Sequence, residues 1–144
     1  MNFLEYSPVV LAQTLHFYYI DWIAANRTWQ GTIVCKRKNI PTPQILRNNR
    51  EVLPRVLDGG WHFTWMGGID RVIEKTYSTV ESYLLLQTEK KVIDREYIQG
   101  CMKNGNFLDD PNYKIESYDI NKIKLPMLKD FLIKYPQFLR ETDI

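Results

Sequence analysis

The stretch that decides the fold is DGGWHFTWMGGIDRVIEK, residues 58–75, in which two glycine pairs enclose an aromatic run. Aromatic enrichment between turn residues is typical of a strand, which we expect to follow residues 55–58 and to continue through the run. Beyond the second glycine pair, helical spacing predicts a helix that begins near Gly68. The apolar residues that share its face are Ile69, Val72, Ile73 and Tyr77. Because glycines let a backbone approach a ligand and a helix start attracts anions, the stretch predicts a candidate anion or sugar site.

Two further strands are expected in the first half of the chain. Residues 14–23, TLHFYYIDWI, and residues 29–36, WQGTIVCK, are rich in aromatic and β-branched residues, and residues 24–28 would turn the chain between them. A short strand is expected over residues 114–118. Residues that typically begin or end a helix indicate three more helices. They extend from Thr42-Pro43 to about Arg50, from Asp94 to Asn104-Gly105, and from Pro126 to Pro136. We therefore expect an α/β chain with a mixed sheet and flanking helices.

Composition indicates one globular domain over residues 1–144. Hydrophobic residues make up 44% and charged residues 25% of the chain, which excludes disorder. The formal net charge of +2 gives no overall basic footprint for nucleic acid. Seven basic residues and one acid lie between Arg27 and Arg55, however. A solvated basic face is the plainer interpretation and an anionic partner the alternative; since the segment has no nucleic-acid-binding motif, no nucleic acid partner is expected.

The cysteines and the N-terminal residues indicate an intracellular environment. Cys35 and Cys101 are far apart in sequence and form neither a disulfide framework nor a zinc pattern, so we expect two buried free thiols. No signal-peptide pattern is present, and the uncharged run from Tyr6 to Ile20 is too short to span a bilayer. The expectation is a cytoplasmic protein without a membrane segment.

His62 and the tryptophans beside it each have two interpretations. On a strand, Trp61, Phe63 and Trp65 face one way, and His62 faces the other. One interpretation places His62 in the core. The other places it in a polar site beside the helix start, as a metal ligand or a hydrogen-bond donor. The tryptophans are either core residues or a wall against which a sugar ring packs.

The helix after the glycine pairs has an unusual charge pattern. Asp70 and Glu74 are four residues apart, and so are Arg71 and Lys75. Each pair therefore places like charges together on the helix surface, which destabilises a helix by a few tenths of a kcal/mol. The pattern is a weak indication that these charges serve a ligand.

The segment GGWHFTWMGGIDRVIEK resembles a hallmark of the family-17 glycosyltransferases, the β-1,4-mannosyl-glycoprotein 4-β-N-acetylglucosaminyltransferases and their relatives. The resemblance extends to HFYYIDW and WQGTIVCKRKNIPTPQILR before it and to REYIQGCMKNGNFLDD after it. It covers most of residues 9–118. The family implies the A-type nucleotide-sugar transferase fold, of which this chain resembles the C-terminal half.

The implied reaction transfers N-acetylglucosamine from UDP-N-acetylglucosamine to a β-linked mannose of a glycan, with inversion. A divalent metal, Mn or Mg, commonly neutralises the leaving diphosphate in this fold, and a carboxylate removes the acceptor proton. By resemblance, His62 is the candidate metal ligand, and Asp70 and Glu74 are the candidate bases. The alternative is a non-catalytic carbohydrate-binding remnant of such an enzyme.

The resemblance also implies roles in binding the substrates. The glycine pair Gly67 and Gly68, with Arg71 and Lys75, would bind the phosphates of the nucleotide sugar. Trp61 and Trp65 would form the wall of the sugar site.

One motif of the family is missing. The family has an Asp-x-Asp-Glu metal motif ahead of the aromatic strand, whereas none of the nine aspartates of this chain is part of an Asp-x-Asp. We therefore expect the chain to be inactive alone, and to pair with a chain that supplies the N-terminal half or to self-associate. Self-association would use an uncovered edge of the strand at residues 14–23.

Overall fold

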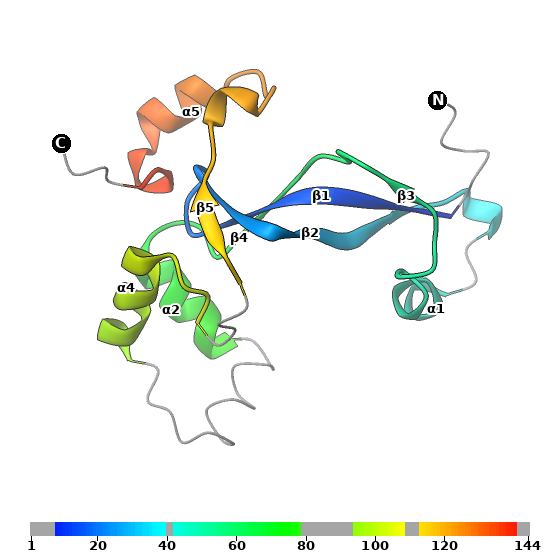
Figure 1. Ribbon diagram of the computed structural model, residues 1–144, viewed down its shortest axis with the longest axis horizontal. Coiled ribbons are helices and arrows are strands. Elements are labelled where there is room, and N and C mark those ends of the chain that lie inside the picture. Colours follow the sequence, from blue (N-terminus) through cyan, green and yellow to red (C-terminus); the bar gives the residue numbers. More distant parts are fainter. Residues whose placement is uncertain (1–7, 40–41, 79–93, 109–112, 141–144) are drawn as a thin grey trace. The chain divides into compact units, whose positions relative to one another are not determined.

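The computed structural model describes residues 8–39, 42–78, 94–108 and 113–140 (Figure 1). The chain divides into two compact units. Unit 1 contains Met1–Leu15 and Arg27–His62, and unit 2 contains His16–Asn26 and Phe63–Ile144.

The strands form one mixed, open sheet (Figure 1). The strands are β1 (Val9–Phe17), β2 (Trp22–Val34), β3 (Arg55–Val56), β4 (Trp61–Thr64) and β5 (Ile115–Ser117). Their order is β3-β1-β2-β5, with β4 also paired to β1. The β1–β3 pair is parallel and the β2–β5 pair antiparallel. The expected class, an α/β chain with a mixed sheet and flanking helices, is confirmed at this level.

The expected strand at residues 14–23 is wrong, because the chain turns at residues 18–21 between β1 and β2. Tyr18 has a positive φ of 59°, and its hydroxyl donates a 3.1 Å hydrogen bond to the Asn106 carbonyl. Such a distant partner leaves no local signal of a turn. The expected turn at residues 24–28 is wrong as well, because these residues are extended in β2. Ala24, for example, pairs with Ile115 of β5.

β1 is a central strand and has no uncovered edge. It pairs with β2 on one side and with β3 and β4 on the other. The Thr14 amide donates to the Gly60 carbonyl at 2.9 Å, and the Tyr18 amide donates to the Thr64 carbonyl at 3.3 Å. The predicted uncovered edge is therefore wrong, and self-association through it is no longer expected.

Unit 1 has few helices. The 3₁₀ helix η2 covers Arg37–Asn39, and α1 covers Pro43–Asn48. Thr42 Oγ1 accepts from the Ile45 amide at 3.2 Å, so the predicted cap at the start of α1 is confirmed. The buried apolar side chains of this unit come from β1: Val9, Val10, Ala12 and Leu15.

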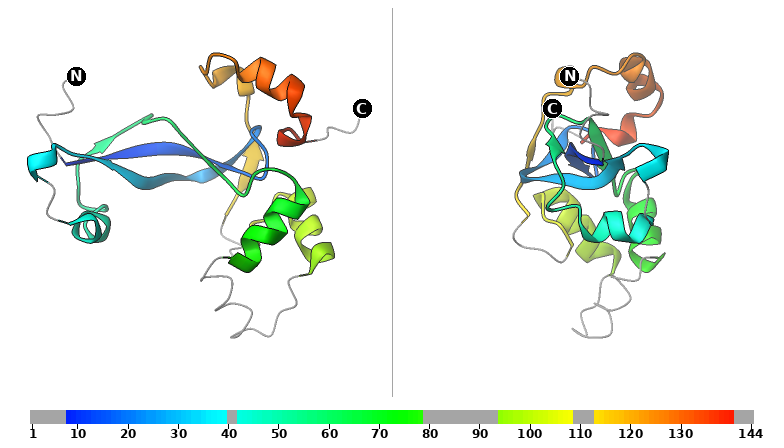
Figure 2. Two further views of the ribbon diagram at one scale, coloured as in Figure 1. Left: turned by 180° about the vertical axis from the view of Figure 1, so that it is seen from behind. Right: turned by 90° about the vertical axis from the view of Figure 1, so that its right-hand side faces the viewer.

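The other helices of the described residues belong to unit 2. They are α2 (Ile69–Ser78), α4 (Arg95–Asn104), η3 (Ile120–Lys122), α5 (Leu128–Lys134) and η4 (Pro136–Phe138). Helices α2 and α4 lie side by side (Figure 2). Their buried side chains are Val72 and Thr76 of α2 and Ile98, Cys101 and Met102 of α4.

The predicted limits of α4 are confirmed. The Asp94 carboxylate caps its start by accepting from the Tyr97 amide at 2.8 Å, and Gly105 ends it at a φ of 69°.

No disulfide joins the two cysteines, as expected; Cys101 is buried, but Cys35 is only half-buried. Among the described residues, no helix is long and apolar enough to cross a membrane.

Candidate functional site

A polar pocket of about 300 Å³ lies in unit 2, where the end of β4 meets α2. Its lining residues are Phe63, Thr64, Trp65, Met66, Arg71, Glu74, Lys75 and Ser78. Four residues that the sequence singled out, Trp65, Arg71, Glu74 and Lys75, therefore come together here. We refer to this hollow as the polar pocket.

The turn between β4 and α2 depends on left-handed backbone. Trp65, Gly67 and Gly68 have φ angles of 59°, 102° and 85°, a region that glycine adopts at the lowest energetic cost. The Val72 amide donates to the Gly68 carbonyl at 3.1 Å, so α2 begins where the sequence predicts. A Cβ on Gly67 would lie 3.2 Å from Cγ of Arg71. Gly67 thus allows Arg71 to lie close to the turn.

Lys75 is the half-buried cation of the polar pocket. Its Nζ donates to Thr64 Oγ1 at 2.8 Å and lies 4.8 Å from the centroid of the Trp65 ring. Burial lowers the pKa of Lys75 below its ordinary value of 10.5. Among the described residues, its two contacts are an uncharged hydroxyl and an uncharged ring. The pocket therefore holds a positive charge that no carboxylate of those residues neutralises.

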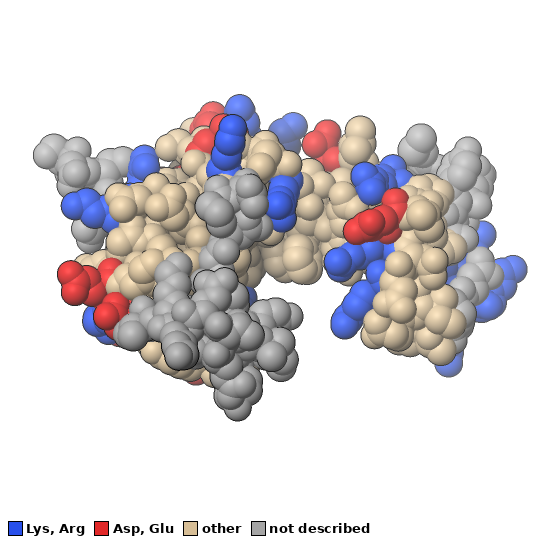
Figure 3. All heavy atoms as spheres, turned by 60° about the horizontal axis from the view of Figure 1, so that its bottom comes forward, with Lys and Arg blue, Asp and Glu red and all other residues tan. Residues whose placement is uncertain are grey.

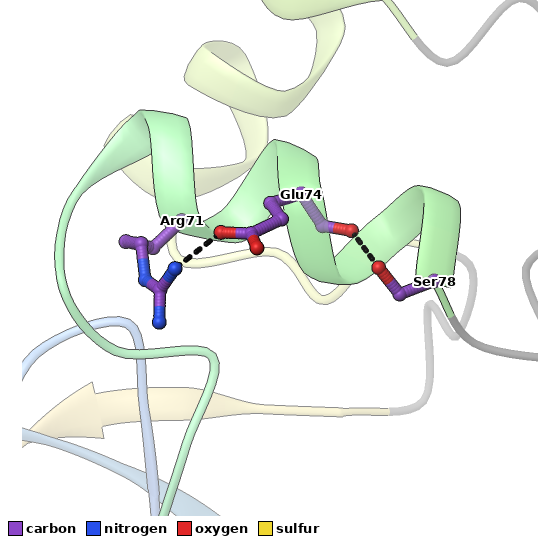
Figure 4. A network of polar contacts seen from close by, with 3 residues as sticks. All are labelled: Arg71, Glu74 and Ser78. Carbon is purple, nitrogen blue, oxygen red and sulfur yellow. Dashed lines mark hydrogen bonds and ion pairs between the residues drawn. The ribbon is translucent and has the colours of Figure 1, made fainter.

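The other charges of α2 form ion pairs that relieve the repulsion expected from their spacing. Arg71 donates to the Glu74 carboxylate, and Ser78 Oγ donates to the Glu74 carbonyl at 2.5 Å (Figure 4). Arg95 Nη1 lies 2.6 Å from Oδ1 of Asp70. These side chains are more than half exposed, so each pair contributes about 1 kcal/mol or less.

The two candidate bases occupy different places. Glu74 lines the polar pocket, whereas Asp70 is not among its lining residues and pairs with Arg95 of α4. Glu74 is therefore the carboxylate that could act on a ligand there, and its pairing with Arg71 would first have to open.

His62 and Trp61 belong to unit 1. The His62 ring stacks on the indole of Trp29, with centroids 4.3 Å apart and planes 15° from parallel. Gly31 makes room for that indole, because a Cβ there would lie 2.5 Å from three of its atoms. The Trp61 carbonyl accepts from Gln13 Nε2 at 3.3 Å. His62 is half-buried, so it is not a core histidine.

The sequence interpretation missed Trp29, whose signal is the glycine two positions later on the same strand face. It also missed His16, which is fully buried in unit 2. His16 Nδ1 donates to the Ile20 carbonyl at 2.7 Å, and its Nε2 has no hydrogen-bond partner among the described residues. Burial lowers the pKa of His16, and the smaller opposing effects of the Ile20 hydrogen bond and the Asp21 carboxylate do not cancel this.

A basic face covers part of unit 1. Unit 1 contains seven Lys and Arg residues and three Asp and Glu residues. Figure 3 shows basic side chains gathered around the part of the chain that carries α1. These charges are spread over an exposed surface and do not line the polar pocket, which agrees with a solvated face.

The polar pocket combines a cation, hydroxyl groups, an aromatic ring and a carboxylate. Such a set can bind a phosphate at Lys75 and the hydroxyl groups of a sugar at Thr64 and Glu74. Comparisons with protein-family models, curated proteins and solved structures found no match to this chain. The case for a function therefore rests on the chemistry of the pocket and on the resemblance in sequence.

Proposed function

We propose that this chain is a glycosyltransferase-like protein whose polar pocket binds the phosphate and sugar of a nucleotide sugar. The donor would be UDP-N-acetylglucosamine and the acceptor a β-linked mannose of a glycan. The observation that carries the proposal is Lys75, a half-buried ammonium whose contacts among the described residues are uncharged. The glycine-bracketed segment that resembles family 17 forms most of this pocket, which supports the proposal further.

A phosphate bound in the polar pocket would neutralise the half-buried charge of Lys75. Removing an ammonium from water is unfavourable unless an opposite charge compensates it. Thr64 and Trp65 hold the position of Lys75 but do not neutralise it. A phosphate oxygen would accept a charge-assisted hydrogen bond from Nζ, which is about twice as strong as a neutral one.

Arg71 and Glu74 could link binding to chemistry. A phosphate that attracts Arg71 would draw it away from Glu74, and the Glu74 carboxylate would then be able to accept a proton from an acceptor hydroxyl. In this proposal Lys75 and Arg71 oppose the charge of the leaving diphosphate, and Glu74 is the base.

The metal that the resemblance implies needs ligands besides His62. Among the described residues, no three His, Cys, Asp or Glu side chains gather at one place. His62 itself stacks on Trp29 in unit 1. The described residues therefore do not fit a metal centre, and the proposal uses no metal in its chemistry.

A second candidate is a carbohydrate-binding protein that does not transfer sugar. The ion pairs of both candidate bases favour it, since Glu74 pairs with Arg71 and Asp70 with Arg95. The two candidates predict the same binding and differ in turnover.

Calorimetric titration of the 144-residue chain with UDP, UDP-N-acetylglucosamine and uridine tests the proposal. We expect both diphosphates to bind and uridine to bind at least tenfold more weakly. Lys75→Met, which keeps the aliphatic stem, should weaken UDP binding about tenfold or more. Lys103→Met is the matched control, because Lys103 is an exposed residue of α4.

Equal affinity of the Lys75→Met variant and the parent chain for UDP would overturn the proposal. UDP release from UDP-N-acetylglucosamine, measured with a mannosyl acceptor with and without manganese, then separates the two candidates. Turnover that Glu74→Gln abolishes without loss of UDP binding supports the transferase. Binding without turnover is the result expected both of the carbohydrate-binding protein and of a transferase half that is inactive alone.

A further inference from the structure

A second hollow in unit 2 is apolar and much larger than the polar pocket. Its volume is about 680 Å³. Its uncharged lining residues are residues 125–128, the aromatic residues Phe131, Tyr135 and Phe138, and Ile20, Phe63 and Met66. Its charged lining residues are Asp130 and Lys134, which carry opposite charges. We refer to this hollow as the apolar pocket; its volume is in the range of sites for small organic ligands.

The apolar pocket leaves large apolar side chains in water. Met127 is 77% exposed and Phe131 is 40% exposed. The ring of Phe131 contacts those of Tyr135 and Phe138, with centroids 5.0 Å and 5.2 Å apart, so the three aromatic side chains form a wall. A concave apolar surface of this kind gains stability when an apolar ligand covers it.

The two pockets share lining residues. Phe63 and Met66 line both of them. The polar pocket adds Lys75 and the hydroxyl of Thr64, and the apolar pocket adds Phe131. One ligand with a polar end and an apolar end could therefore occupy both pockets at once.

We propose that the sugar acceptor of this chain carries an apolar chain as its aglycone. The mannose would lie beside the donor where the polar pocket meets Phe63 and Met66, and an alkyl or prenyl chain would extend from it into the apolar pocket. The inference rests on the proposed function for the sugar end. The opposite charges of Asp130 and Lys134 leave the apolar pocket without a net charge, which suits an uncharged hydrocarbon chain.

Titration with methyl β-D-mannoside and octyl β-D-mannoside, below the micelle concentration of the latter, tests the inference. Each buried methylene group raises affinity about fourfold. We therefore expect the octyl compound to bind at least tenfold more tightly. Met127→Ser should remove most of this difference, whereas the matched control Ile133→Ser should not. Ile133 is 81% exposed, like Met127, but does not line the apolar pocket.

UDP binding, measured on the same samples, separates this inference from the proposed function. If UDP binds and the two mannosides bind alike, the inference is overturned and the proposed function stands. If UDP does not bind, but the octyl compound binds more tightly in a Met127-dependent way, the apolar site is supported and the proposed function fails. A dimer in sedimentation that Met127→Ser dissociates would mean that a second copy covers the pocket, which would overturn the inference.

Discussion

The ammonium nitrogen of Lys75 lies 4.8 Å from the centroid of the Trp65 ring. A half-buried lysine usually pairs with a carboxylate, whereas here the neighbour is the face of an aromatic ring. An aromatic face attracts a cation but adds no negative charge. The position of Lys75 is therefore fixed while its charge remains available to a ligand. Binding at this residue should follow the protonation of its amine.

We predict that UDP affinity falls with rising pH earlier than an ordinary lysine would allow. Burial lowers the pKa of Lys75 below 10.5, and only the protonated amine attracts the diphosphate. Affinity is then complete below the pKa of the folded protein and is lost as the pH rises through it. Calorimetry between pH 7 and 10 measures the decline. Lys75→Arg is the control, because arginine stays charged and should keep the profile flat. A decline of equal size in that variant would contradict the prediction.

Substitution of Gly68 should destabilise the folded protein because of the backbone conformation of this residue alone, without any steric clash. Its φ is 85°, and an added Cβ would meet no atom within 4 Å. Gly68→Ala should therefore lower the free energy of unfolding by about 1–2 kcal/mol. Gly100→Ala is the matched control. Position 100 is helical and equally open, so this change should raise stability by about 0.5–1 kcal/mol. Urea unfolding of both variants gives the signs, and two changes of the same sign would refute this account.

Gly31→Ala should break the stack between Trp29 and His62. A Cβ there would lie 2.5 Å from the indole, so the ring has to move. Nuclear magnetic resonance should show the ring protons of His62 losing the ring-current shift that a stacked indole causes. Gly31→Ala combined with Trp29→Leu removes the clash, and the double variant should recover the stability that the single variant loses. Unchanged His62 shifts in Gly31→Ala would contradict the expected displacement.

His16 should make the fold sensitive to acid. Its pKa in the folded protein lies below the ordinary value of 6.5, so the unfolded chain binds the proton more readily. Stability is complete above the unfolded value and falls as the pH drops below it, by at most about 1.4 kcal/mol per pH unit. Thermal unfolding between pH 7 and 5 measures this loss.

The variant His16→Phe should lack that part of the pH dependence. His62→Gln is the control for the other histidine of the chain and should retain it. Because the carboxylates of the chain titrate in all three proteins, only the difference between the profiles matters. Identical profiles for His16→Phe and the parent chain would show that another group causes the loss.

The parts of the fold that could be predicted are those that neighbouring residues determine. The caps at Thr42 and Asp94 and the start of α2 after Gly68 each depend on contacts within a few residues. The turn at residues 18–21 does not. Tyr18 bonds to Asn106, and the Asp21 carboxylate accepts from the Arg140 amide at 3.1 Å, so partners 88 and 119 positions away hold it.

The candidate site shows the same division. Trp65, Arg71, Glu74 and Lys75 belong to one short segment and line one pocket, so the sequence alone indicates that they lie close together. The stack of Trp29 on His62 joins two distant strands and could not be predicted. The apolar pocket was missed for a related reason. The sequence predicts a helix from Pro126 to Pro136, but it does not show that Phe131 and Tyr135 line a hollow.

The close fit of Gly31 beneath Trp29 has an evolutionary consequence. As long as position 29 carries an indole in this place, any side chain at position 31 has to displace it, although a strand normally favours larger residues there. A lineage that loses the tryptophan is released from this constraint, and β-branched residues should then accumulate at position 31. Related chains should thus show the two positions changing together.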